Sequence, residues 1–208
     1  MRGRFFGILD DMTLTSALNW IVGILTAVFF LVLFILILSG RRIPVTRIRL
    51  AIGTYIVLVV MQIVFSILLV YYAWKGSNSA EVYFTFPYSN KIYSVLSEAL
   101  AYFGVSVAVG IVVIALLSVV RKKRSDLLES QDVWLLGFGG MIAGWPQVLI
   151  FLVLVFLCTV IFKILRVALK KEQMSDRILI TPAIPPAVII IIFFGDLLAR
   201  WTGLWVLR

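Results

Sequence analysis

The sequence predicts an all-α integral membrane protein with six transmembrane helices, and two observations carry that prediction. First, 62% of its residues are hydrophobic and the mean hydropathy is +1.11, whereas soluble globular domains are about 45–50% apolar. Second, only 14% of the residues are charged, and these collect between long apolar runs. No polar stretch is long enough for a soluble domain. We therefore expect one transmembrane domain over residues 1–208, in the cell (plasma) membrane as a multi-pass protein.

Six apolar segments account for the expected helices. A helix rises 1.5 Å per residue, so crossing about 30 Å of hydrocarbon takes about 20 residues. The fourth segment is too short to cross unless its polar lead-in is also helical. Pro146, which follows it, predicts a tight turn into the fifth. The predicted spans are 17–38, 50–74, 96–120, 133–145, 148–165 and 178–198.

The basic residues predict the topology. Most of the 19 Lys and Arg residues fall in the connections between spans one and two, three and four, and five and six. Because basic loops stay in the cytoplasm, these connections are expected there, with both termini outside. The net charge of +9 could also indicate a protein that binds nucleic acid. Because the basic residues flank the membrane spans, a role in setting the membrane orientation explains them more simply, so no nucleic-acid partner is expected.

The numbers of histidine and cysteine residues exclude several classes of metal site and catalytic nucleophile. The chain has no histidine and one cysteine, Cys158, inside an apolar run. Histidine-ligated haem, zinc sites and Ser-His or Cys-His nucleophiles are therefore excluded. We expect no metal and no cofactor, and we interpret Cys158 as a packing residue.

One carboxylate stands out at the edge of the fourth apolar segment. Asp132 lies at the point where the acidic stretch from Asp126 enters the apolar run, and ionisable groups at that depth are functional candidates. The competing interpretation is an acid near a helix N-terminus, favoured by the helix dipole. Asp126 and Glu129, three residues apart, also fit a helix-start cap. The spacing of Gly137, Gly140 and Gly144 indicates close helix packing.

The last span opens with three prolines, Pro182, Pro185 and Pro186. Proline lacks an N–H and clashes with the preceding turn, so we expect the span to be kinked or interrupted here. Irregular backbone at membrane depth is tolerated only when it is buried in protein or lines a wet cavity. The sequence therefore predicts a cavity at the start of this span, on the side where Asp132 lies.

Three blocks of the sequence stand out together. They are a first cytoplasmic loop (Arg41-Arg42-Ile43-Pro44), a glycine-rich helix (Asp132-Val133, Leu135-Leu136, Gly140, Gly144-Trp145) and a last span (Thr181-Pro182-Ala183-Ile184-Pro185, Phe194-Gly195-Asp196). In order and spacing these blocks resemble the type IV prepilin peptidases, including the archaeal preflagellin peptidases. The resemblance implies a six-helix fold and an aspartic endopeptidase of the GxGD type, which cleaves class III signal peptides of prepilins just before their hydrophobic helix.

The aspartate pair that the resemblance implies is incomplete. Asp132 matches the second catalytic aspartate of the family, but the position of the first is occupied by Ile37. Aspartic proteolysis needs two neighbouring carboxyl groups, one ionised and one protonated, and isoleucine cannot exchange a proton. Glu129, three residues before Asp132 on the same helix face, is a possible substitute partner.

Four further residues are expected around this site. Gln131 replaces the signature glycine of the family and Trp134 replaces its lysine, which removes a positive charge. Pro182 and Pro185 are expected to form part of the wall of the site around Asp132. Together these four are candidates for substrate binding.

The sequence leaves three functional hypotheses open. The first is a prepilin-peptidase-like pseudoenzyme, impaired by Ile37, whose partners besides the lipid bilayer are pilin-type signal helices or another membrane protein. The second is a working endopeptidase with Asp132 as half of its pair. The third is a small transporter or a structural subunit of a membrane complex. Proline-broken helices suit transporters, but the halves show no inverted repeat and only one acid is deeply placed.

Overall fold

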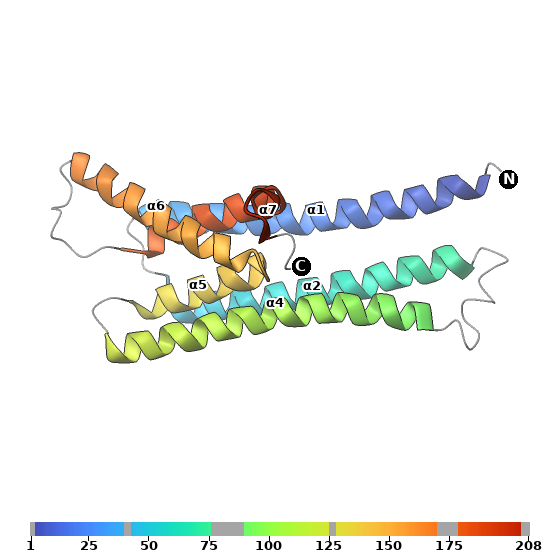
Figure 1. Cartoon of the computed structure of the whole chain (residues 1–208), viewed down its shortest axis with the longest axis horizontal. Coiled ribbons are helices and arrows are strands. Elements are labelled where there is room, and N and C mark those ends of the chain that lie inside the picture. Colours follow the sequence, from blue (N-terminus) through green and yellow to red (C-terminus); the bar gives the residue numbers. More distant parts are fainter. Residues whose placement is uncertain (1–2, 40–42, 76–89, 125–127, 170–178, 205–208) are drawn as a thin grey trace. The chain divides into compact units, whose positions relative to one another are not determined.

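A computed structural model describes residues 3–39, 43–75, 90–124, 128–169 and 179–204, and every regular element within these ranges is a helix (Figure 1). The chain divides into two compact units. One comprises residues 1–25 and 53–103, and the other comprises residues 26–52 and 104–208. All candidate site residues that the structure describes belong to the second unit, so the description below concerns that unit. The single domain over residues 1–208 stays a prediction.

The helices contain most of the predicted spans. Within the described residues, the chain first forms α1 (Gly3–Leu38), α2 (Val45–Lys75), α4 (Asn90–Lys123), α5 (Ser130–Ala143) and α6 (Val148–Ala168). A 3₁₀ helix, η1 (Thr181–Ala183), then leads into α7 (Ile184–Trp201). The last helical segment thus begins three residues after the predicted start at residue 178.

Among the residues that the structure describes, five helical segments are long and apolar enough to cross a membrane, which supports a multi-pass membrane protein. The fourth predicted span corresponds to α5, which has only 14 residues and extends about 21 Å at 1.5 Å per residue. That length falls short of the hydrocarbon core. Six spans and external termini therefore stay predictions. The five segments are Ile21–Leu38, Val45–Phe65, Phe103–Lys123, Gln147–Ala168 and Thr181–Trp201.

Helix α5 forms the core of the second unit although it is the shortest of the α-helices that the structure describes. Most of its residues are buried, from Asp132 near its start to Ala143 at its end. The longer helices instead leave many large apolar side chains exposed, such as Leu116 of α4 and Phe156 of α6. Exposed apolar faces suit lipid, whereas a helix buried on all sides is shielded by protein.

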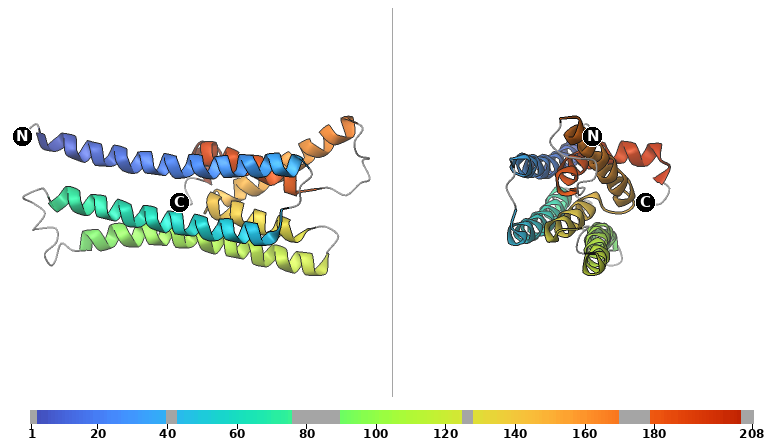
Figure 2. Two further views of the ribbon diagram at one scale, coloured as in Figure 1. Left: turned by 180° about the vertical axis from the view of Figure 1, so that it is seen from behind. Right: turned by 90° about the vertical axis from the view of Figure 1, so that its left-hand side faces the viewer.

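A tight turn joins α5 to α6, as Pro146 predicted (Figure 2). Gly144 ends α5 with φ of +64°, a conformation that favours glycine. A Cβ at this position would also lie 2.7 Å from the hydroxyl oxygen of Ser106 in α4. The backbone N–H of Val148 then donates to the carbonyl of Gly144 at 2.8 Å, which closes the turn.

The prolines of the last span begin the helix, which corrects the expectation that they kink or interrupt it. Pro182 lies in η1, and Pro185 and Pro186 lie in the first turn of α7, which then continues to Trp201. First-turn N–H groups have no intrahelical acceptor, so a proline loses no helix bond there. The segment from Thr181 to Pro185 is buried in protein, in place of the predicted wet cavity.

The Phe194-Gly195-Asp196 block of α7 contacts the α5–α6 turn. The side-chain amide of Gln147 donates to Asp196 Oδ1 at 2.8 Å. A Cβ on Gly195 would lie 3.1 Å from Gln147 Oε1, which is tighter than ordinary contact. The glycine therefore lets the amide lie against α7, and the two far-apart sequence blocks meet here.

Glycines on both helices bring α4 and α5 close together. A Cβ on Gly137 of α5 would overlap the side chain of Ile114 in α4. In the other direction, a Cβ on Gly110 of α4 would lie 2.8 Å from Met141 Cβ and 3.0 Å from the carbonyl oxygen of Gly137. Small residues at such a contact let two backbones approach. The predicted packing role of Gly137 is confirmed.

We predict that Gly137→Ala destabilises the protein and that Gly140→Ala does not. The new methyl group at 137 has to displace Ile114, which costs about 1–3 kcal/mol. At 140 it would lie 3.4 Å from Val113 Cγ2, in ordinary contact. Thermal unfolding in detergent measures both variants. Ile114→Ala should be less destabilising in Gly137→Ala than in the wild type, because it removes both side-chain atoms of Ile114 that the new methyl group overlaps. Equal effects of the two glycine substitutions would contradict this account.

Candidate functional site

Asp132 is buried near the N-terminus of α5, where its carboxylate binds backbone at the helix start. It is 4% exposed, and its Oδ2 accepts the backbone N–H of Glu129, the N-cap residue, at 2.9 Å. An acid at the third helical position is favoured there because it satisfies an N–H and opposes the helix dipole. The cap thus involves Glu129 and Asp132. Asp126, which the sequence suggested as part of it, lies outside the described residues.

Thr181 binds the other carboxylate oxygen. Its hydroxyl donates to Asp132 Oδ1, and the side chain is 6% exposed at the first position of η1. Both carboxylate oxygens of Asp132 are therefore hydrogen-bond acceptors for groups of the protein itself. Sequence reasoning missed the role of this threonine. The one available signal was its place in the Thr181-Pro182 block. That signal does not identify Asp132 as its partner, because only the tertiary structure brings the two residues together.

Gln131 extends this network to a second carboxyl group. Its side-chain amide donates to Glu129 Oε2 at 3.0 Å and lies 3.4 Å from the Thr181 hydroxyl oxygen. An amide NH₂ has two hydrogens, and a hydroxyl can donate one bond while accepting another. The bonds therefore run from Glu129 through Gln131 and Thr181 to Asp132. The two carboxylates share one network, in which an amide and a hydroxyl lie between them.

The ring of Trp134 in α5 lies against a positively charged side chain, Arg49. The guanidinium carbon of Arg49, on α2, lies 4.4 Å from the centroid of the Trp134 ring. A cation over an indole face is stabilised by the ring quadrupole. The resemblance implied a lysine at this position. Here the cation comes from a different helix and joins α2 to α5.

The other predicted site residues pack within the second unit. Pro182 and Pro185 are buried, so their rings contact protein, and their role in substrate binding stays a prediction. Ile37 is half-buried on α1, one helical turn after the buried Leu33. No carboxylate is available from that position.

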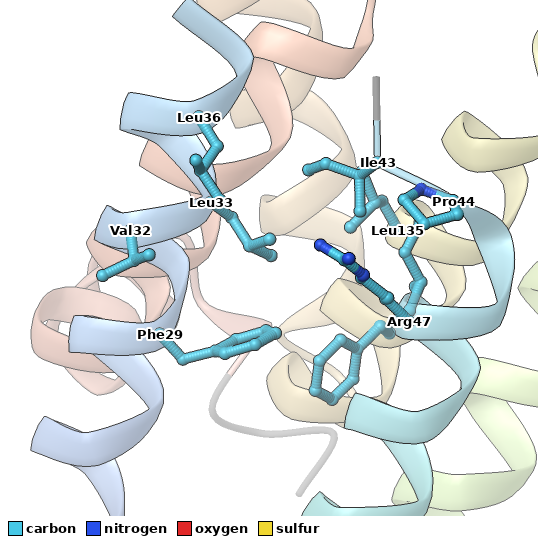
Figure 3. Close-up of a pocket in the computed structure, with 10 residues that line it drawn as sticks. Phe29, Val32, Leu33, Leu36, Ile43, Pro44, Arg47 and Leu135 are labelled. Atoms are coloured by element: carbon cyan, nitrogen blue, oxygen red, sulfur yellow. The ribbon is translucent and has the colours of Figure 1, made fainter. Parts of the chain in front are cut away.

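An apolar pocket of about 260 Å³ lies next to this part of α5 (Figure 3). Three elements line it: the last part of α1, the segment that begins α2, and α5. Leu135 of α5 follows Asp132 by three residues, so the pocket lies one helical turn beyond the carboxylate. The lining residues are Phe29, Val32, Leu33, Leu36, Ile43, Pro44, Arg47, Ile48, Leu135 and Phe138.

No protein-family model, no curated protein and no solved structure matches the chain. Within the part of the chain that the structure describes, no group of three or more Cys, Asp or Glu side chains is placed to hold a metal ion. The site is thus a buried hydrogen-bonded carboxylate with a neighbouring apolar pocket.

We predict that Thr181→Val destabilises the protein much more than Thr181→Ser. Valine matches the shape of threonine but leaves the buried Asp132 Oδ1 without this donor, which costs about 1–3 kcal/mol. Serine keeps the hydroxyl. Thermal unfolding of the two variants in the same detergent measures the difference. A valine variant as stable as the serine variant would show that the bond does not hold α5 to η1.

Proposed function

We propose that this chain is a polytopic membrane protein of the prepilin-peptidase type that does not cleave. In this proposal it binds the hydrophobic helix of a pilin-type signal peptide, and Asp132 has a structural role without taking part in catalysis. One observation carries the proposal: both oxygens of Asp132 accept hydrogen bonds from Thr181 and Glu129, while Ile37 stands where the resemblance places the first catalytic aspartate.

The contacts between the resembling blocks support the relationship. Thr181 of the last block meets Asp132 of the glycine-rich block. At the far end of α7, Asp196 meets Gln147 in the turn that ends the glycine-rich block. The loop block also reaches α5, because Ile43 and Leu135 line one pocket. These blocks are distant in the sequence. The resemblance requires that they lie next to one another in the fold, and the contacts above bring the other two blocks to the glycine-rich block.

The chemistry of aspartic peptidases supports the loss of activity. Such an enzyme activates a water between two carboxyl groups that share a proton. In this protein the hydroxyl of Thr181 lies against one oxygen of Asp132, and a backbone N–H lies against the other. These donors fix the carboxylate within the packing of α5 and η1.

A working endopeptidase is the second candidate, and the network around Gln131 favours it. Glu129 and Asp132 are connected through Gln131 and Thr181. For a functional pair, Glu129 would have to leave the Gln131 amide and approach Asp132. The two candidates therefore differ in whether these two carboxyl groups act together on a substrate.

We predict that the protein reconstituted in liposomes does not cleave a prepilin or preflagellin bearing a class III signal peptide. An active prepilin peptidase acting on the same substrate is the positive control. The protein is tested as wild type and as Asp132→Asn, Glu129→Gln and Asp196→Asn, with product measured by gel shift and mass spectrometry. Asp196 is the matched control because it lies at the opposite end of α7.

Cleavage by the wild type would contradict the proposal. If Asp132→Asn and Glu129→Gln abolished it while Asp196→Asn did not, Glu129 would be the substitute partner. Loss with Asp132→Asn alone would point to another carboxyl group.

We further predict that the protein retains binding of the signal helix. A photo-crosslinker in the hydrophobic segment of the prepilin should label the wild type and Asp132→Asn equally, because the carboxylate is buried and does not face a bound helix. Thermal unfolding verifies that the variant is folded. A transmembrane peptide of the same composition in shuffled order is the control. Equal labelling by the prepilin and the shuffled peptide would contradict specific binding.

A further inference from the structure

We propose that the pocket beside Arg47 binds an anionic phospholipid, with one acyl chain in its apolar part and the phosphate on the Arg47 guanidinium. This inference is independent of the proposed function, since it requires neither a signal peptide nor the Asp132 network. It rests on the volume, lining and depth of the pocket. It also rests on the Arg47 guanidinium, which makes no hydrogen bond or ion pair within the described residues.

The volume is large enough for part of a flexible chain. The pocket measures about 260 Å³, larger than the roughly 150 Å³ cavity that admits a benzene molecule. Apart from Arg47, all the lining side chains are apolar. A segment of an acyl chain satisfies both the size and the apolar lining.

Arg47 supplies the charge that selects the headgroup. Figure 3 shows its side chain extending from α2 toward Leu33 of α1, across the pocket. In the described residues, no hydrogen bond or ion pair involves its guanidinium. Arg49, two residues later, instead lies over Trp134. The Arg47 side chain is exposed, so its guanidinium is accessible to a phosphate, which matches its fork of donors.

The depth of the pocket matches a lipid in the bilayer. Arg47 lies near the start of the candidate span Val45–Phe65, and the preceding candidate span ends at Leu38, so the guanidinium is near the membrane surface. Phe29 lies nearer the middle of its span, about 13 Å along the helix from the end at Leu38, at 1.5 Å per residue. The lining therefore runs from headgroup level into the hydrocarbon. A cation at that level attracts anionic lipids.

The test measures lipid binding to the full chain in detergent. Native mass spectrometry compares phosphatidylglycerol with phosphatidylcholine of identical acyl chains, on wild type, Arg47→Gln and Arg121→Gln. Arg121 is the control because it is an exposed basic residue in the last turn of α4 and does not line the pocket. We expect phosphatidylglycerol to bind about fivefold to tenfold tighter than phosphatidylcholine. Arg47→Gln should abolish that preference, and Arg121→Gln should preserve it.

Two further arms locate the acyl chain and separate lipid from free phosphate. Leu36→Trp fills the pocket from α1 and should weaken binding of both lipids, with thermal unfolding used to verify that the variant is folded. Glycerol 3-phosphate, which has no acyl chain, should not compete.

Four outcomes would overturn the proposal. They are equal binding of the two lipids to the wild type, equal effects of the two arginine substitutions, unchanged binding to a folded Leu36→Trp, and competition by glycerol 3-phosphate. The last would indicate a phosphate site without a lipid. None of these outcomes bears on cleavage or on crosslinking of a signal helix, so the two proposals fail separately.

Discussion

The hydrogen bond from Thr181 to Asp132 is the contact on which the second unit depends. It joins the start of α5 to the start of the last helical segment, two points 49 residues apart in the chain. Asp132 is also bound by the N–H at the helix cap, so one carboxylate fixes where α5 begins and where η1 lies against it. A buried carboxylate is costly to leave without hydrogen-bond partners. The packing of α5, α6 and α7 is therefore built around a polar contact inside an apolar protein.

The remaining features of the unit let helices approach this contact. Gly137 and Gly110 bring α4 against α5, and Gly195 lets the turn between α5 and α6 contact α7. Each glycine marks a place where a side chain would separate two backbones. Shape complementarity of this kind matters more in a membrane than in water, because lipid tails do not drive apolar helices together.

The sequence predicted the helices well and the site only in part. Apolar runs locate membrane helices directly, since each must match the thickness of the bilayer. The prolines were misinterpreted because proline both breaks a helix and begins one, and only the boundary at Thr181 distinguishes the two. Asp132 was found because a carboxylate in an apolar run is rare. Its partner Thr181 and the pocket beside Arg47 were missed, because each depends on contacts between segments distant in the sequence.

The short length of α5 has a consequence for biosynthesis. A helix of 14 residues that is glycine-rich and buried on most sides gains little from leaving the translocon for lipid alone, because its surface is shaped for other helices. Its neighbours α6 and α7 are synthesised after it. Helix α4, which precedes α5 in the chain, is already made and packs against its Gly137. We therefore expect α5 to stay beside α4 until α6 and α7 have been synthesised and can complete its burial.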